Sequence, residues 1–107
     1  MVTAKVQAGI CGFVSDITAD SDDGQNVTFK ITSNCDKITR LAAILPVVDA
    51  YAEIGDGYDG QVYQPFRKGS SGCCAGCAVA VGLFKAMQVA AHLALPQEVH
   101  ITIMKSE

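Results

Sequence analysis

The sequence predicts an α+β fold: a two-layer sandwich in which an antiparallel β-meander is packed by two or three helices on one face. Three observations predict it. Apolar and polar residues alternate in three N-terminal segments separated by short turns, apolar residues then recur at helical spacing, and alternation returns near the C-terminus. With 107 residues, half of them hydrophobic, the chain is expected to form a single domain over residues 1–107 around one core.

The N-terminal strands are expected at residues 2–8, 13–19 and 27–32, where apolar and polar side chains alternate. A polar turn over residues 20–24, with Asp-Gly at its tip, joins the second strand to the third. Short turns between consecutive strands are typical of an antiparallel meander. A fourth strand at the C-terminus is expected to complete the sheet.

Helical spacing begins directly after the third strand. Ser33 or Asn34 is a suitable N-cap, because both side chains can accept a hydrogen bond from the first turn of a helix. Pro46 is expected to break this helix or to start a second one. The apolar face of the first helix recurs at i, i+3, i+4 and i+7 and consists of Ile38, Leu41, Ala42 and Leu45.

The C-terminal half alternates between irregular and regular segments. The connection over residues 55–72 is Gly-rich and irregular, with a short strand expected at 61–63. The helix expected over 73–95 is apolar on most sides, so it lies in the centre of the core or forms the interface of a homodimer. Pro96 ends this helix, and alternation over 99–103 predicts the final strand.

Charge and hydropathy exclude several classes of function. The net charge is −3 and no basic run occurs, which excludes the footprint of a nucleic-acid-binding protein. No stretch of 18 uncharged apolar residues is present, so no membrane segment is expected. The N-terminal residues lack the apolar core of a signal peptide. We therefore expect a cytoplasmic protein whose thiols stay reduced.

Five cysteines are many for a small cytoplasmic domain, and their positions predict a shared site. Cys11 lies in the turn between the first two strands, and Cys35 lies at the start of the first helix. The first and third strands of a meander run the same way, so both thiols belong to one end of the sheet. The long irregular connection can bring the Cys-Ala-Gly-Cys pair of Cys74 and Cys77, at the start of the long helix, to the same end.

Thiolates clustered at helix N-termini favour soft metals. The sequence therefore predicts an iron–sulfur cluster or zinc as the cofactor. Cys73 is a spare thiol beside these ligands, or itself one of them. The predicted metal ligands are Cys11, Cys35, Cys74 and Cys77.

Two other classes of function are compatible with the same residues. In a thiol redox enzyme or sulfur carrier, Cys77 or Cys74 would be the nucleophile and Cys35 or Cys11 the resolving thiol. In a non-catalytic interaction module, the thiols would be packing residues and the helix over 73–95 would form a homodimer. The sequence leaves open whether the protein is an enzyme.

Four segments of the chain resemble a family of small uncharacterised prokaryotic proteins, met largely in anaerobes. The resemblance implies a core of three thiols, Cys11, Cys35 and Cys77, and leaves the fourth ligand open between Cys73 and Cys74. It implies no substrate and no reaction. The segments that carry the resemblance are Ala8–Phe13, Ser33–Cys35, Cys77–Val79 and Val89–Pro96.

Overall fold

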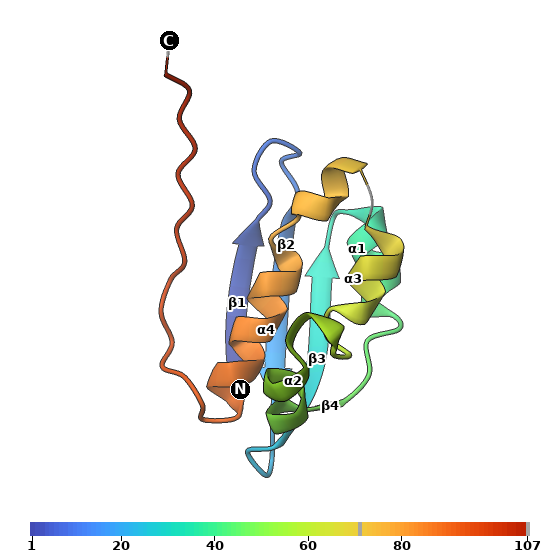
Figure 1. Cartoon of the computed structure of the whole chain (residues 1–107), viewed down its shortest axis with the longest axis vertical. Coiled ribbons are helices and arrows are strands. Elements are labelled where there is room, and N and C mark those ends of the chain that lie inside the picture. The colour runs from blue at the N-terminus through green and yellow to red at the C-terminus, as the bar shows by residue number, and fades with distance from the viewer. Residues whose placement is uncertain (71, 107) are drawn as a thin grey trace.

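A four-stranded antiparallel sheet forms one layer of the protein, and helices form the other (Figure 1). The computed structural model describes residues 1–70 and 72–106, apart from the Cys73 side chain. The strands lie side by side in the order in which they occur along the chain. They are β1 (Val2–Gln7), β2 (Val14–Asp20), β3 (Asn26–Ser33) and β4 (Val48–Asp49). The α+β class and the N-terminal meander are confirmed.

Alternation in the sequence explains which face of the sheet is buried. In β2 the side chains of Ser15, Ile17 and Ala19 are all buried, while Asp16 and Asp20 on the other face are exposed. The one buried hydroxyl in this row is satisfied, because the Ser15 Oγ lies 2.9 Å from the Ser33 Oγ of β3 and hydrogen-bonds to it. A half-buried sheet of this kind places its apolar face against the helices.

The helices that the structure describes all cover this one face of the sheet (Figure 1). The irregular connection contains more regular structure than the sequence predicts, since the 3-10 turn η1 and the helix α3 lie within it. These helices are α1 (Asp36–Ala42), α2 (Ala50–Asp56), η1 (Gly57–Asp59), α3 (Gln64–Gly69), η2 (Gly72–Gly76) and α4 (Val79–Ala90).

The helix α4 packs across β1 and β2 and supplies much of the core. It approaches the sheet closely at Gly82, where a Cβ atom would lie only 2.7 Å from the Val6 Cγ2 atom. The prediction of one helix over 73–95 is wrong in its limits, because η2 occupies the first residues of that range and α4 ends at Ala90. The outer face of α4 is also less apolar than expected, with Lys85 exposed.

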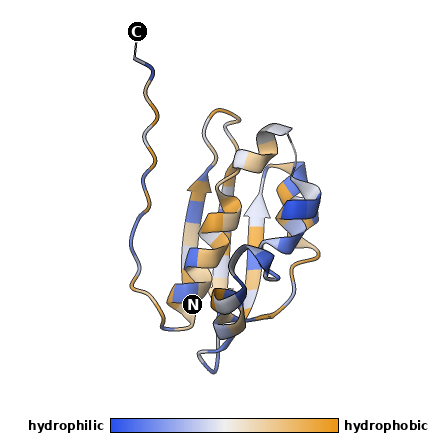
Figure 2. Cartoon of the chain, viewed as in Figure 1, coloured by the Kyte–Doolittle hydropathy of each residue, from blue (hydrophilic) through white to orange (hydrophobic). Residues whose placement is uncertain are grey.

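Two predicted strands are absent from the sheet of the described chain. Residues 61–63 form a turn, and the fourth strand is the short β4 rather than the C-terminal segment. Val48 pairs with Val27 of β3, and the Ala50 N–H donates to the Gln25 carbonyl at 2.8 Å, so β4 occupies the start of the outer edge of β3. Residues 97–106 instead run as an extended, exposed tail in which hydrophobic and hydrophilic residues alternate (Figure 2).

Candidate functional site

Three cysteine-bearing segments lie at one end of the sheet. The loop between β1 and β2, the start of α1 and the turn η2 all lie at the end to which β1 and β3 point (Figure 1). This is the arrangement that the meander topology predicts. We call Cys11, Cys35, Cys74 and Cys77 the thiol end, and all four are free thiols in this structure.

Cys11 is the most accessible of these thiols, because it lies at the tip of the β1–β2 loop. The loop is closed by the Gly12 N–H, which donates to the Gly9 carbonyl at 2.9 Å. Both glycines have positive φ, 91° at Gly9 and 74° at Gly12, which a side chain would strain. The loop therefore presents Cys11 to solvent on a well-defined turn.

Cys35 is held by its backbone at the beginning of α1. It is the N-cap residue, with φ −96° and ψ 121°, and its side chain makes no capping hydrogen bond. Its backbone N–H donates to the Ser33 Oγ at 3.1 Å, which fixes the entry to the helix. The Cys35 side chain is half-buried against the core. The predicted N-caps Ser33 and Asn34 instead bond to other backbone groups, and the Asn34 Oδ1 accepts from the Val14 N–H.

Cys74 has a cationic partner. The Lys37 Nζ, on the first turn of α1, donates to the Cys74 Sγ at 3.3 Å. A cation beside a sulfur favours the anionic thiolate, the form that acts as a nucleophile. The contact also joins η2 to α1 across a long separation in the sequence. Sequence reasoning missed Lys37, because nothing in the sequence places this lysine near η2.

Cys77 lies three residues after Cys74, directly after the η2 turn. The Cys77 N–H donates to the Cys74 carbonyl at 3.1 Å, which closes an i to i+3 turn. Side chains separated by three residues in a 3-10 turn lie above one another. The Cys77 side chain is half-buried and packs against the core, whereas Cys74 faces Lys37. In the Cys-Ala-Gly-Cys segment, the Cys77 thiol therefore packs against the core and the Cys74 thiol contacts a cation.

The thiols do not form a recognisable metal centre in the part of the chain that the structure describes. Within it, no group of three or more His, Cys, Asp or Glu side chains is arranged to hold a metal ion. The Cys73 side chain lies outside the described atoms. The metal ligand set of Cys11, Cys35, Cys74 and Cys77 therefore stays a prediction that this geometry does not support.

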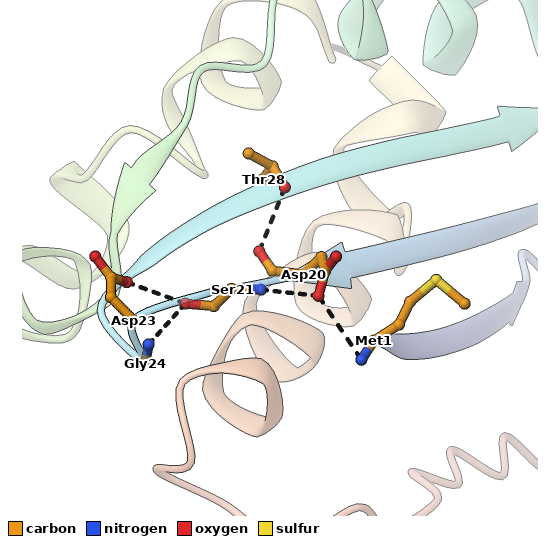
Figure 3. Close-up of polar contacts among 6 residues, drawn as sticks. All are labelled: Met1, Asp20, Ser21, Asp23, Gly24 and Thr28. Atoms are coloured by element: carbon orange, nitrogen blue, oxygen red, sulfur yellow. Dashed lines mark hydrogen bonds and ion pairs between the residues drawn. The ribbon is translucent and has the colours of Figure 1, made fainter.

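The opposite end of the sheet carries acidic side chains, which we call the carboxylate end: Asp23, Asp49 and Glu53. The Asp23 Oδ1 accepts from the Gln25 and Asn26 N–H groups at 2.9 and 2.8 Å. These bonds, that to Asn26 first, lower the pKa of Asp23 from its ordinary value of 3.8. Figure 3 shows the neighbouring contacts of this turn, in which the Ser21 hydroxyl lies between Asp23 and the Gly24 N–H.

The carboxylates of Asp49 and Glu53 also accept hydrogen bonds from groups close to them in the sequence or the fold. Asp49 is the N-cap of α2, and its carboxylate also accepts from the Gln25 side-chain amide at 2.7 Å, which lowers its pKa. Glu53 is buried, and its two oxygens accept from the Gln61 and Val62 N–H groups at 2.9 and 2.6 Å. These carboxylates hold turns together, which leaves the thiol end as the candidate for chemistry.

The fold and the site define the class: a small α+β protein with several reduced thiols at one end of its sheet. The family model of DUF6951, a family of unknown function, matches residues 2–103, and the chain belongs to that family. No curated protein and no solved structure matches the chain significantly. Among the helices described, none is long and apolar enough to cross a membrane.

Proposed function

We propose that this protein carries out thiol–disulfide chemistry, with Cys74 as the attacking thiol and Lys37 as a positioning residue. The observation that supports the proposal best is the 3.3 Å contact between the Lys37 Nζ and the Cys74 Sγ. No other thiol of the described residues has a hydrogen bond to its sulfur from a cationic side chain. Cys74 is also partly exposed, so a substrate can reach it.

The proposed first step is attack of the Cys74 thiolate on a disulfide. A bond forms between the Cys74 sulfur and one substrate sulfur while the substrate disulfide breaks. The second substrate sulfur leaves as a thiolate and takes a proton from solvent, replacing the proton that Cys74 lost. The product is a mixed disulfide at Cys74, with no net change in the number of disulfide bonds.

The proposed second step uses Cys77 as the resolving thiol. Its sulfur attacks the Cys74 sulfur of the mixed disulfide, and the remaining half of the substrate departs as a thiolate. The substrate disulfide has then gained two electrons, and Cys74 and Cys77 have become a disulfide. A thiol reductant, such as glutathione or a reduced dithiol protein, would return this pair to its starting state. The i to i+3 turn between Cys74 and Cys77 supports this pairing.

Alkylation rates test the role of Lys37. Iodoacetamide is added at neutral pH, and peptide mass spectrometry follows each cysteine in a Cys73→Ser background, so that the peptide reports on Cys74 alone. We expect Cys74 to react faster than exposed Cys11. We expect Lys37→Gln to slow Cys74 about two- to fivefold, the size of an exposed ionic contact, and Lys37→Arg to retain most of the rate.

Lys85→Gln is the control, because Lys85 is an exposed cation on α4. It should leave the rate at Cys74 unchanged. Equal rates at Cys74 and Cys11 in the wild-type protein would contradict the proposal. A rate at Cys74 that is unchanged in Lys37→Gln would also contradict the proposal.

Glutathione disulfide tests the resolving step. In the Cys73→Ser background, we expect the dithiol protein to form a Cys74–Cys77 disulfide and to release reduced glutathione. In Cys77→Ser, the mixed disulfide should instead accumulate at Cys74. A mixed disulfide that accumulates equally in both proteins would remove Cys77 from the mechanism.

A second candidate function is the one that the sequence predicts, a zinc ion or iron–sulfur cluster bound by thiolates at the same end. It requires thiols from three separate segments to converge, which the described residues do not do. Anaerobic purification in iron-supplemented medium tests it, since a bound cluster would absorb visible light and Cys77→Ser would remove the absorption. A reducing, cytoplasmic and anaerobic prokaryotic setting would suit either chemistry, because it keeps the thiols reduced.

A further inference from the structure

The C-terminal tail exposes a row of large apolar side chains. Val99, Ile101 and Ile103 are 54%, 75% and 90% exposed, and none of them contacts the core. Residues 97–106 are extended and belong to no strand of the sheet described. A continuous apolar row of this kind on an extended segment marks a surface that another chain covers.

The tail has the sequence of an edge strand. Its apolar residues alternate with Glu98, His100 and Thr102, so a strand formed here would have one apolar face and one polar face. The tail therefore has the same pattern as β1, in which alternate residues are half-buried and exposed. Three apolar positions in the tail match three in β1, at Val2, Ala4 and Val6.

The edge of β1 is the natural partner for such a strand. In the sheet order, β1 is an outer strand that pairs only with β2, so half of its backbone hydrogen-bonding groups face outward. Its half-buried residues lie against α4, as the closeness of Val6 to Gly82 shows. A strand added beside β1 would continue this apolar face. Its Glu98 would bring a negative charge to the polar face that carries Lys5.

The end of α4 leads through a tight turn into the tail. Ala91 and His92 close the end of the helix, their N–H groups donating to the Met87 and Val89 carbonyls at 3.0 and 3.1 Å. His92 has φ 62°, an uncommon conformation for a side-chain-bearing residue. The tail then runs alongside the β1 side of the sheet without joining it (Figure 1). Short, constrained connections of this kind favour the exchange of a terminal strand between two copies.

We propose that the tail of one copy pairs as a strand with β1 of a second copy, and that the second tail does the same in return. Each copy supplies one tail and one edge, so the two-fold arrangement closes and leaves neither outer edge of β1 open. The exchange buries the apolar row of the tail. It also differs from a dimer formed through the outer face of α4, which is one of the two arrangements that the sequence suggests for this helix.

Three variants of the full-length chain test the proposal by light scattering over a range of concentrations. The wild type is expected to be a dimer. Ile101→Asp places a charge on the apolar face of the tail and should raise the dimer Kd at least about a hundredfold. Thr102→Asp changes the neighbouring residue on the polar face and should leave the dimer intact. Val81→Asp, on the exposed face of α4, should also leave it intact.

Hydrogen exchange distinguishes the occupants of the β1 edge. Amides of the tail and the outward-facing amides of β1 should be protected in the wild-type dimer and should lose protection together in Ile101→Asp, while those of β3 stay protected. A wild-type monomer whose tail is protected would mean that the tail folds onto its own chain. A monomer with an unprotected tail would mean that the edge is reserved for another protein. Either result overturns the proposal, and so does a dimer that Val81→Asp breaks and Ile101→Asp does not.

Discussion

The two ends of the sheet differ in how their polar side chains are used. At the carboxylate end, Asp23, Asp49 and Glu53 each accept hydrogen bonds from backbone N–H groups of nearby loops. At the thiol end, the described residues make one side-chain hydrogen bond to a sulfur, from the Lys37 Nζ to the Cys74 Sγ. Because these carboxylates hold backbone N–H groups in place, they maintain the fold. A nucleophile with a single cationic partner remains available for a substrate.

This difference separates stability from reactivity. Changes at the carboxylate end should destabilise the fold and leave thiol reactivity in the folded protein unchanged. Changes at the thiol end should do the reverse. The following variants test this separation, beginning with the largest expected effect.

Glu53→Ala should be the most destabilising of these changes. It removes the acceptor of the buried Val62 N–H and of the partly buried Gln61 N–H, at a cost of about 3 kcal/mol in the free energy of unfolding. Chemical denaturation measures the loss, with Glu98→Ala as the control because Glu98 is exposed. Gly60→Ala should destabilise through the same site, since its Cβ would lie 2.8 Å from the Glu53 Oε1 atom. A Glu53→Ala protein as stable as the control would contradict this assignment.

Asp49→Ala should have a smaller effect on stability. The substitution removes the N-cap of α2 and the acceptor of the Gln25 side chain, but both groups are exposed and water can replace the lost bonds. Thermal unfolding should show a lower midpoint than wild type and a higher one than Glu53→Ala. Asp49→Asn should recover part of the loss, because its carbonyl can still cap the helix.

Acid should destabilise the protein through the same end. The pKa values of Asp23 and Asp49 are lowered from 3.8 in the folded state, so these groups bind protons more readily after unfolding. Their stabilising contribution is present above pH 3.8 and is lost as the pH falls toward the folded-state pKa values. The free energy of unfolding, measured from about pH 5 down to about pH 2, should fall less steeply in Asp23→Asn. An unchanged slope would show that Asp23 is not linked to folding.

Cys74→Ser should have the smallest effect on stability and the largest on reactivity. A partly exposed thiol with one surface contact contributes within about 0.5 kcal/mol. The same substitution should abolish the fast phase of alkylation. A large loss of stability in Cys74→Ser would mean that this thiol is a packing residue, as the interaction-module hypothesis holds.

The sequence predicts the sheet far better than the connections. Alternation places β1, β2 and β3 within a residue or two of their limits, because one buried face forces a period of two on each strand. It misses α3, because that helix, with Pro65 in its first turn, lies inside a Gly-rich segment that has no apolar period of its own. It also misses β4, which is a two-residue strand fixed by pairing with β3 rather than by its own sequence.

The candidate site shows the same limit. The shared end of the cysteine-bearing segments follows from topology, and the sequence predicts it. The pairing of Lys37 with Cys74 depends on how η2 and α1 pack, which no local pattern records. The sequence does not predict the role of Glu53 either, since a glutamate on a short helix is normally exposed to solvent. The sequence shows the alternation of the tail, but whether the tail joins the sheet depends on the path of the chain after α4.

The most direct test of the central claim is the rate of alkylation at Cys74 compared with that at Cys11 in the same molecule at neutral pH. Because both thiols meet the same reagent, the change in the ratio of their rates between wild type and Lys37→Gln isolates the effect of the Lys37 contact. We expect a ratio of Cys74 to Cys11 rates above one in the wild type and a lower ratio in Lys37→Gln. A ratio that is the same in the two proteins would contradict the claim.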